Sequence, residues 1–420
     1  MNSTIMLFLV QDGITNGAIY ALLGLALVLV FAVTRVILIP QGEFVTYGAL
    51  TYASLASGQM PGTAKLAVAM GAAAFLLDLF AARRTLHKAR TARAFIVDIA
   101  LPAIVLALTV FAVGRHPPIA ISIVLSLAIV ALIGLFLYRL AFQPLAHTSV
   151  LVLLIASVGC HLAMQGLGLL FFGAEGQRGP TVADTALNLG PLRFTGQSLA
   201  VYAITVAFIG ALWLFFGLTL YGKALRATAV NRLGARLAGI RTTLSGQIAF
   251  LLASMIGALS GILIVPITTL YYDTGFLIGL KGFIAAIIGG LVSYPVTAIA
   301  ALIVGMVEAF SSFYASNFKE VIVLRFCFRC CCCDRSPCPK PRKRRTDARC
   351  ESACPHCSLP RSWPRSRFCR TCRRSGSFFS IISGCRRWSR WVSFFSPGSA
   401  VSLRSDRRRS AVLEPTPPPS

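Results

Sequence analysis

Long apolar runs dominate the first three quarters of the chain. A helix that crosses the hydrocarbon core needs roughly 20 mostly apolar residues, because each residue adds about 1.5 Å and no water is present to satisfy open backbone groups. Suitable runs lie at 5–33, 43–58, 64–81, 95–113, 117–138, 149–172, 199–217 and 246–266. A ninth apolar region, 281–312, is interrupted by Gly289-Gly290 and Tyr294-Pro295, and we expect two short halves there. The first run is too long for a cleavable signal peptide. The pattern predicts an all-α integral membrane protein, a polytopic helical bundle of about eight to ten spans.

Composition agrees with the membrane prediction and divides the chain in two. Hydrophobic residues make up 56% and charged residues only 13%, which excludes an ordinary soluble domain. The net charge of +26 could suggest nucleic-acid binding. However, residues 1–324 hold 18 Lys and Arg against 9 Asp and Glu, whereas residues 325–420 hold 22 against 5. Of the 13 cysteines, 12 follow residue 324. We therefore predict a transmembrane domain over 1–324 and a separate Cys/Arg/Ser/Pro-rich tail over 325–420.

The distribution of positive charge predicts an orientation, since cytoplasmic loops keep Lys and Arg. Two short loops are basic: one holds Arg83, Arg84, Lys88, Arg90 and Arg93, and the other holds Lys223, Arg226, Arg232, Arg236 and Arg241. Placing both in the cytoplasm puts the N-terminus on the outer side of the membrane and also puts Arg35 and Arg139 inside. Only Lys65, Arg115, Arg178, Arg193, Lys281 and Lys319 are then expected at or near the outer side.

Catalytic, cofactor and metal signatures are missing from the predicted membrane domain. Gly217–Ala224 approaches the phosphate-binding pattern G-x-x-x-x-G-K-[ST], but it lacks the final Ser or Thr and ends a membrane helix. Cys160 and His161 are adjacent in an apolar helix, so they point to different faces and cannot form a local nucleophile–base pair. We expect a non-enzymatic protein whose energy, if it uses any, comes from another subunit.

The basic loop at 222–241 is the most informative stretch. Small and apolar residues could form one face of a short amphipathic helix: Ala224, Leu225, Ala227, Leu233, Ala235 and Leu237. The arginines project elsewhere, and Gly239 is a plausible helix stop. A rigid helix of this kind suits docking into a groove on a cytoplasmic partner. The alternative is a solvated basic loop that only fixes topology.

Several motifs resemble the LivH-type family of branched-chain amino-acid permeases, which belong to bacterial ABC importers. The loop matches the family's pattern G-x-A-x-R-A-x-A-x-N followed by A-x-L-x-G-I, at Gly222, Ala224, Arg226, Ala227, Ala229, Asn231, Ala235, Leu237, Gly239 and Ile240. The resemblance extends to residues 16–22, 142–145, 279–283 and 288–290. One stretch departs: the family often has Asn-x-Ala-His-Gly entering the second span, whereas Ile39-Pro40-Gln41-Gly42-Glu43 stands here.

The resemblance implies an inner-membrane permease subunit that works with a second permease, two cytoplasmic ATP-binding subunits and a periplasmic substrate-binding protein. Apart from membrane lipid, no other partner is implied, and no nucleic acid. In that scheme Arg226, Asn231 and Arg236 contact the ATPase, and Gly239 permits the turn back to the membrane. The alternative is a secondary transporter that couples a small solute to protons through Glu308 or Glu43.

Polar residues inside spans are costly and usually face a cavity or a partner helix. The candidates for a substrate pathway are Asn16, Gln41, Glu43, Gln165 and Glu308. We expect Gln41 and Glu43 near the cytoplasmic mouth, where they could instead anchor the topology. Glu308 is expected well inside a half-span, either on the pathway or in a helix–helix hydrogen bond.

The tail admits two interpretations. Cys354-x-x-Cys357 and Cys369-x-x-Cys372 have zinc-site spacing within each pair, but only 11 residues separate the pairs. Alternatively, Cys330–Cys333 would be encoded by repeated TGC, which is the leucine codon CTG read one base out of step. We favour an out-of-frame tail from about Leu324 that replaces a lost last helix; if expressed, it would be disordered and basic.

Overall fold

The computed structural model describes residues 3–82, 95–115, 118–146, 148–182, 187–189, 192–291 and 293–334. Its helices, in chain order, are α1 (Ser3–Thr34), α2 (Gln41–Ala56), α3 (Gly62–Ala82), the π-helical turn η1 (Ile96–Ala100), α5 (Leu101–Val113), α6 (Ile119–Leu137), the π-helical turn η2 (Tyr138–Phe142), α7 (Val150–Phe172), α8 (Gly196–Leu218), α9 (Leu220–Val230), α10 (Arg232–Leu237), α11 (Thr242–Ile264), α12 (Thr274–Ile288), α13 (Tyr294–Tyr314), the 3₁₀ turn η3 (Ser316–Phe318) and α14 (Lys319–Asp334). A small antiparallel pair is formed by β1 (Leu187–Leu189) and β2 (Leu192–Phe194). The basic loop at 83–93 and the C-x-x-C pairs at 354–372 lie outside the described residues.

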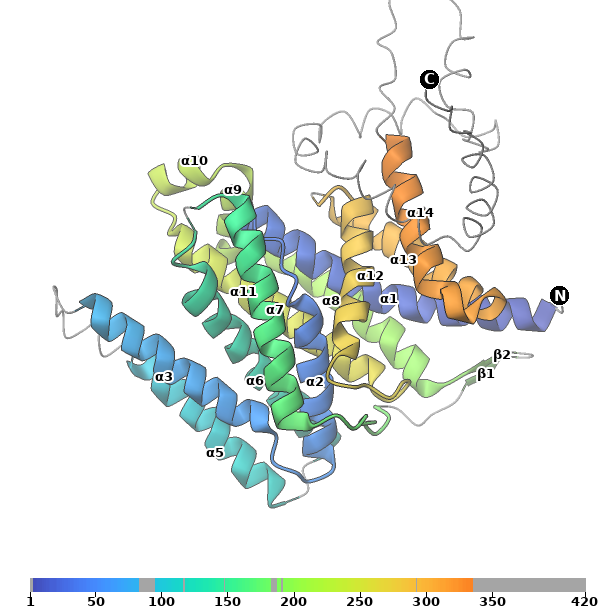
Figure 1. Ribbon diagram of the computed structural model, residues 1–420, viewed down its shortest axis with the longest axis horizontal. Coiled ribbons are helices and arrows are strands. Elements are labelled where there is room, and N and C mark those ends of the chain that lie inside the picture. The colour runs from blue at the N-terminus through green and yellow to red at the C-terminus, as the bar shows by residue number, and fades with distance from the viewer. Residues whose placement is uncertain are drawn as a thin grey trace, which may run out of the picture. The chain divides into compact units, whose positions relative to one another are not determined.

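The described residues contain eight helices long and apolar enough to cross a membrane, and these confirm the predicted polytopic helical bundle (Figure 1). Most of the predicted runs agree with the observed helices to within a few residues at each end. Helix α12 is shorter, with 15 residues, and α2 has 16. These two short helices carry three of the buried polar residues of the bundle, Gln41 and Glu43 on α2 and Lys281 on α12.

The prediction of two short halves over 281–312 was wrong. Helix α12 begins seven residues earlier, at Thr274, and α13 is a complete span of 21 residues. Pro295 lies in the first turn of α13, where its missing N–H has no intrahelical partner to lose. It therefore starts a full helix and does not interrupt one. Gly290, whose φ is +71°, turns the chain after α12 ends.

Helices α1, α2 and α11 form the centre of the bundle. Within the most apolar window of α1, 94% of residues are buried, against 17% for α8 and 22% for α7. Helix α2 is buried on all sides from Gln41 to Leu55, as expected for a helix whose apolar and small residues surround the whole axis. The outer helices present apolar side chains that suit lipid or a second subunit.

Glycines allow the closest helix contacts. A Cβ atom at Gly13 would lie 2.9 Å from the Met306 Cα, and one at Gly17 would lie 2.8 Å from the Leu302 Cα. Since lipid supplies no hydrophobic driving force between helices, small residues that permit backbone approach stabilise such pairs. Helices α1 and α13 therefore pack as one tight antiparallel unit.

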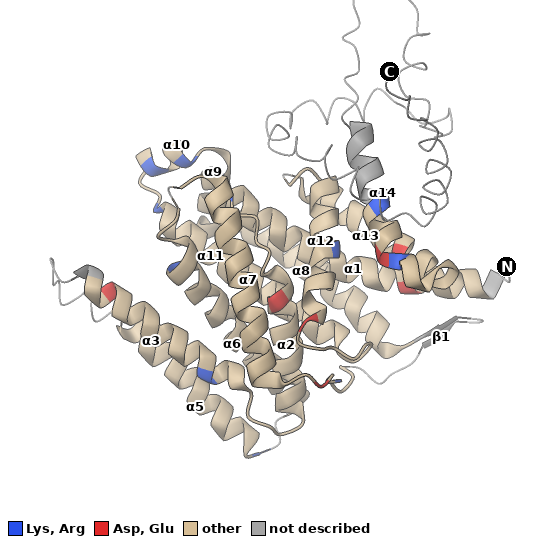
Figure 2. Ribbon diagram, in the orientation of Figure 1, with Lys and Arg blue, Asp and Glu red and all other residues tan. Residues whose placement is uncertain are grey.

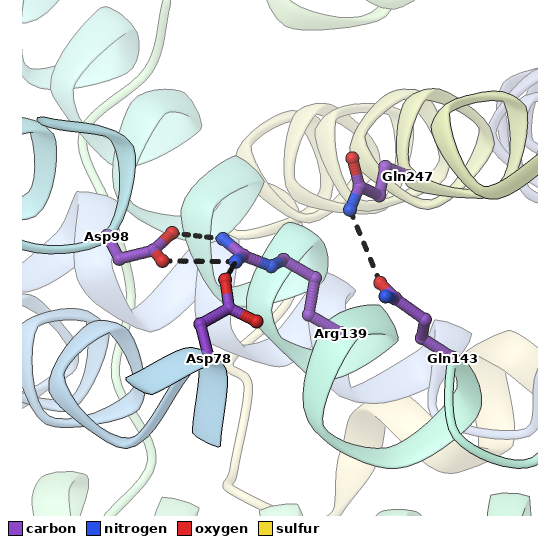
Figure 3. A network of polar contacts seen from close by, with 5 residues as sticks. All are labelled: Asp78, Asp98, Arg139, Gln143 and Gln247. Atoms are coloured by element: carbon purple, nitrogen blue, oxygen red, sulfur yellow. Dashed lines mark hydrogen bonds and ion pairs between the residues drawn. The ribbon is translucent and has the colours of Figure 1, made fainter. Parts of the chain in front are cut away.

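Helices α3 and α5 form a hairpin at one side of the bundle (Figure 1). Figure 3 shows how it is tied to η2, which follows α6: the Arg139 guanidinium bridges Asp98 and Asp78, with its Nη2 atom 2.6 Å from the Asp78 Oδ2. Beside it, the Gln247 amide donates to the Gln143 side-chain oxygen at 3.3 Å, which joins α11 to the chain after η2.

Candidate functional site

The segment 219–241 folds as two short capped helices. The Thr219 hydroxyl accepts from the Gly222 N–H at 3.0 Å and caps α9. The Asn231 side-chain oxygen accepts from the N–H groups of Leu233 and Gly234, both at 3.0 Å, and caps α10. The expectation of one continuous helix was wrong because Asn231 has an extended backbone, with φ −150° and ψ 104°, and begins a new helix.

The end of α10 is fixed by Gly239. Its φ of +81° lies in the left-handed region, which glycine adopts without a Cβ penalty. The Gly239 N–H donates to the Arg236 carbonyl at 3.0 Å, and the Ile240 N–H donates to the Ala235 carbonyl at 2.9 Å. These two bonds form a Schellman motif. The predicted helix stop at Gly239 is confirmed.

The predicted single apolar face is not present. Leu225 and Ala235 are buried against the bundle, whereas Leu233 and Leu237 are 69% and 84% exposed. Since the chain changes direction at Asn231, residues that share a face on one ideal helix separate onto two. Val230, at the end of α9, is 85% exposed. Three large apolar residues thus project outward from a segment that also carries the loop's positive charge.

Two arginines of the segment donate hydrogen bonds within the chain. The Arg226 guanidinium donates to the Phe216 carbonyl at the end of α8, and the Arg236 Nε donates to the Thr242 hydroxyl at 3.2 Å. Burial lowers the pKa of the Arg232 guanidinium; Tyr138 opposes this, and the neighbouring cations Arg236 and Arg35 add to it. The segment therefore lies at the same end of the bundle as Arg35.

An open groove of about 570 Å³ runs along α9 and α10. It is lined by Lys223, Arg226, Ala227, Val230, Asn231, Gly234, Ala235, Ala238 and Ile240. Figure 2 shows Lys and Arg residues at this end of the bundle, on α10 and close to it. The groove combines cationic and apolar chemistry on a rigid support.

Of the candidate pathway residues, Glu308 lies in a separate ionic cluster. Its Oε1 is 2.5 Å from the Lys281 Nζ, and the Tyr20 hydroxyl donates to its Oε2 at 2.6 Å. The Lys281 Nζ also lies 3.0 Å from the Glu320 Oε1. Lys281 was expected at or near the outer side, but it is buried in the middle of α12. The cluster joins α1, α12, α13 and α14, which corresponds to the helix–helix alternative for Glu308.

Gln41 and Glu43 lie deeper than expected. The Gln41 Nε2 donates at 3.0 Å to the carbonyl of Ala253, the twelfth of 23 residues in α11. The Glu43 Oε1 lies 3.0 Å from the Nδ1 of His161, which is the twelfth of 23 residues in α7. Both partners are at helix midpoints and both side chains are buried. Their expected position near the cytoplasmic mouth was therefore wrong, because residues 35–40 carry the chain back into the bundle before α2 starts.

The five candidates do not converge on one point. Asn16 is half-buried on α1, one turn before Tyr20, and Gln165 is half-buried on α7, one turn after His161. Sequence reasoning missed His161, Lys281 and Tyr20 as partners of the buried carboxylates. The signal was available for His161, since an ionisable residue at the centre of a 23-residue apolar run is itself unusual.

Comparison with known proteins gives a consistent result. Residues 9–326 match the family model described as branched-chain amino acid transport system / permease component. The permease protein LivH of the high-affinity branched-chain amino acid transport system from Escherichia coli K12 is 27% identical over 215 residues, which cover 49% of this chain and 68% of that protein. BraD, the corresponding permease protein of Pseudomonas aeruginosa, is 26% identical over 205 residues, or 47% of this chain and 66% of that protein. No solved structure matches the chain.

Proposed function

The chain belongs to the family of branched-chain amino acid transport permeases, and from this premise we propose that it is the inner-membrane permease subunit of an ABC importer for branched-chain or related amino acids. A permease is a transport protein and not an enzyme. ATP hydrolysis is accordingly assigned to two cytoplasmic ATP-binding subunits, and substrate delivery to a periplasmic binding protein. A second permease completes the pore and covers part of the apolar outer surface.

The observation that supports coupling to an ATPase is the exposed apolar edge of α9 and α10. Val230, Leu233 and Leu237 are 85%, 69% and 84% exposed although they lie in a polar connection between two spans. Large apolar side chains that cluster on such a surface are typical of a contact site. The groove beside them gives a helix or loop of the ATPase a place to bind.

In this proposal, the polar residues that were expected to contact the ATPase hold α9 and α10 in place instead. Arg226, Asn231 and Arg236 hold α9 and α10 in place through the hydrogen bonds already described. They are positioning residues, and the direct contact is assigned to Val230, Leu233 and Leu237. Lys223 and the free edges of the guanidinium groups add attraction to acidic groups on the partner.

Motion of the segment would be passed to the centre of the bundle. Leu225 of α9 packs in a buried cluster with Leu29 of α1 and Ala249 of α11. The Thr228 hydroxyl also lies 3.3 Å from the Ser245 hydroxyl of α11. Helix α11 is bonded to the start of α2 through Gln41. A displacement of α9 by the ATPase would thus move α1, α11 and α2 together.

The test uses the assembled importer in reconstituted vesicles that enclose ATP, with the binding protein and L-leucine outside. The double variant Leu233→Glu/Leu237→Glu should insert normally, lose copurification of the ATP-binding subunit and lose ATP-driven uptake of L-leucine. A charge-reversed Arg226→Glu/Arg236→Glu protein should also lose transport, because the segment is no longer held. The matched control is Arg115→Glu, a charge reversal at the expected outer end of α5, which should change neither property.

Two results would contradict the proposal. One is normal ATPase binding and uptake by the Leu233→Glu/Leu237→Glu protein. The other is uptake by the wild-type protein that stops with an uncoupler and needs no ATP, as a proton-coupled carrier would behave. The expected periplasmic N-terminus is tested separately, by attaching a reporter that is active only in the periplasm to the N-terminus.

A further inference from the structure

Three arginines lie close together where two spans end. Arg35 follows directly after α1, and Arg232 and Arg236 are four residues apart on α10, which places them on one face of that helix. The end of α1 packs against the same segment, since Val33 and Leu225 of α9 belong to one buried cluster. Burial lowers the pKa of the Arg232 guanidinium, and the positive charges of Arg236 and Arg35 lower it further, because a neighbouring like charge disfavours the charged form. We name these three residues the arginine cluster.

The arginine cluster has no negative partner among the described residues. None of the ion pairs found there includes Arg35, Arg232 or Arg236, and no carboxylate contributes to the pKa shift of Arg232. Arg232 is half-buried, and its buried Nε has no hydrogen-bond partner within the part of the chain that the structure describes. Buried polar groups are nearly always bonded, and buried charges are nearly always paired. A half-buried cation with an unbonded N–H beside two further cations therefore indicates a site for an anion.

The backbone at Arg35 supports this interpretation. Its φ is +62°, in the left-handed region where glycine or asparagine usually follows a helix and where other residues incur a steric cost. The Arg35 guanidinium lies 5.9 Å from the centre of the Phe31 ring, which holds it beside the end of α1. An arginine that keeps an unfavourable backbone conformation and forms no ion pair with a described residue points to a function for its charge.

The arginine cluster lies at the depth where lipid head groups are expected. Arg35 is the first residue after the span α1, and the Arg236 Nε bonds to the hydroxyl of Thr242, the first residue of the span α11. Leu244, in the first turn of α11, is 44% exposed, so apolar surface begins beside the cluster. An anionic phospholipid offers a phosphate for the guanidinium groups and acyl chains for this apolar surface. A free phosphate offers the first of these alone.

We propose that Arg35, Arg232 and Arg236 form a site for the phosphate of an anionic phospholipid. The lipid belongs to the membrane leaflet at this end of the bundle, which is the cytoplasmic leaflet under the proposed function. The guanidinium groups donate charge-assisted hydrogen bonds to the phosphate oxygens, and the Arg232 Nε–H is one of the donors. The phosphate charge offsets the repulsion among the three cations and holds α10 against the end of α1.

The lipid site and the proposed ATPase contact use different faces of α10. Leu233 and Leu237 each follow an arginine of the cluster by one residue, and successive residues of a helix point in different directions. Lipid and the ATP-binding subunit can therefore bind α10 at the same time. The inference goes beyond the proposed function, because it depends neither on the transported solute nor on ATP.

The test measures the melting temperature of the purified full chain in a neutral detergent, since a ligand that binds only the folded protein raises this temperature. Phosphatidylglycerol should raise the wild-type value. Phosphatidylcholine, whose head group has no net charge, should not. Inorganic phosphate distinguishes a free anion from a lipid, and it should have little effect because it lacks acyl chains.

Two substitutions each remove one charge of the cluster. Arg232→Gln should weaken phosphatidylglycerol binding about tenfold, because a hydrogen bond to a charged group is lost. Without lipid its melting temperature should not fall, since repulsion among the cations is relieved, whereas removal of an arginine with a purely structural role would lower it. Arg35→Asn uses a residue that tolerates the left-handed backbone and should have the same two effects.

Arg241→Gln is the matched control. It removes an exposed charge from the same segment, and this charge is not among those that lower the pKa of Arg232. The variant should bind phosphatidylglycerol as the wild-type chain does. All three variants should still copurify with the ATP-binding subunit.

Three results would overturn the lipid site. One is equal phosphatidylglycerol binding by the wild-type chain, Arg232→Gln and Arg35→Asn. The second is stabilisation by inorganic phosphate without any by phosphatidylglycerol, which would make a free anion the ligand. The third is a wild-type chain that does not respond to phosphatidylglycerol, together with an Arg232→Gln protein that no longer copurifies with the ATP-binding subunit, which would assign the cluster to an acidic group of that subunit. Normal ATPase binding by Leu233→Glu/Leu237→Glu would contradict the proposed function and leave the lipid site standing.

Discussion

Lys281 offers the sharpest test of how the bundle is held together. Its ammonium group is buried, at 2.5 Å from the Glu308 carboxylate and 3.0 Å from the Glu320 carboxylate. Lys281→Met keeps the length and apolar body of the side chain but removes the charge. The Glu308 carboxylate, only 8% exposed, then keeps the Tyr20 hydroxyl as its remaining described partner.

The size of the loss in stability depends on which buried charged group loses its partner. Removing one partner of a buried ion pair costs about 3–5 kcal/mol in soluble proteins, because the other charge stays buried without compensation. Retention of the Tyr20 hydrogen bond places Lys281→Met near the lower end, at about 3 kcal/mol. Glu308→Gln should cost less, about 1–2 kcal/mol, because Lys281 still has Glu320 beside it. The double variant Lys281→Met/Glu308→Gln leaves neither charge and should be more stable than Lys281→Met alone.

The measurement is denaturant unfolding of the purified protein in one detergent, with the two single variants and the double variant treated as a cycle. Asp12→Asn is the control, since it neutralises an exposed acid on α1 and should not shift the midpoint. The reasoning is refuted if the two single effects simply add in the double variant. It is equally refuted if Glu308→Gln destabilises the protein more than Lys281→Met does.

Three further substitutions test separate parts of the structure. Asn231→Ala removes the cap of α10 and should cost about 1 kcal/mol, seen as faster amide exchange at the start of that helix; unchanged exchange would contradict the capping assignment. Gly239→Ala forces a Cβ into a left-handed backbone and should cost about 1–2 kcal/mol, whereas Gly159→Ala, with open space around it in α7, should not lower the melting temperature. Arg139→Ala leaves Asp98 buried without its partner and should cost about 3–5 kcal/mol; a melting temperature equal to that of wild type would show that the ion pair does not hold the hairpin.

The sequence alone was sufficient to predict most of the membrane spans and the helix stop at Gly239. Apolar length alone placed most of the crossing helices, because the bilayer imposes one thickness on all of them. Gly239 could be assigned as a helix stop because the requirement for a left-handed residue is local. The Asn231 cap was equally local, yet it was overlooked, because an amphipathic pattern was extended across it.

Depth and pairing could not be predicted in the same way. Gln41 and Glu43 follow an ordinary span in the sequence, and only the fold shows that residues 35–40 re-enter the bundle. Lys281 follows a polar loop, so its charge suggested an outer position. Its burial depends on Glu308 and Glu320, which come from the next two α-helices, α13 and α14. Such contacts depend on tertiary arrangement, which a count of charges per loop does not contain.

The polar groups of this protein can be sorted by whether the chain itself satisfies them. Glu308, Lys281 and Arg139 have bonded partners, and losing one of them should be seen first in stability. The Thr46 hydroxyl and the Gln41 side-chain oxygen are as deeply buried but have no hydrogen-bond partner among the described residues, so removing either one should cost little stability. The same distinction separates Arg226, which is bonded to α8, from Leu237, which is apolar and exposed. Under the proposed function, the exposed Leu237 side chain is buried only in contact with the ATP-binding subunit, so its loss should be seen first in that contact and not in stability.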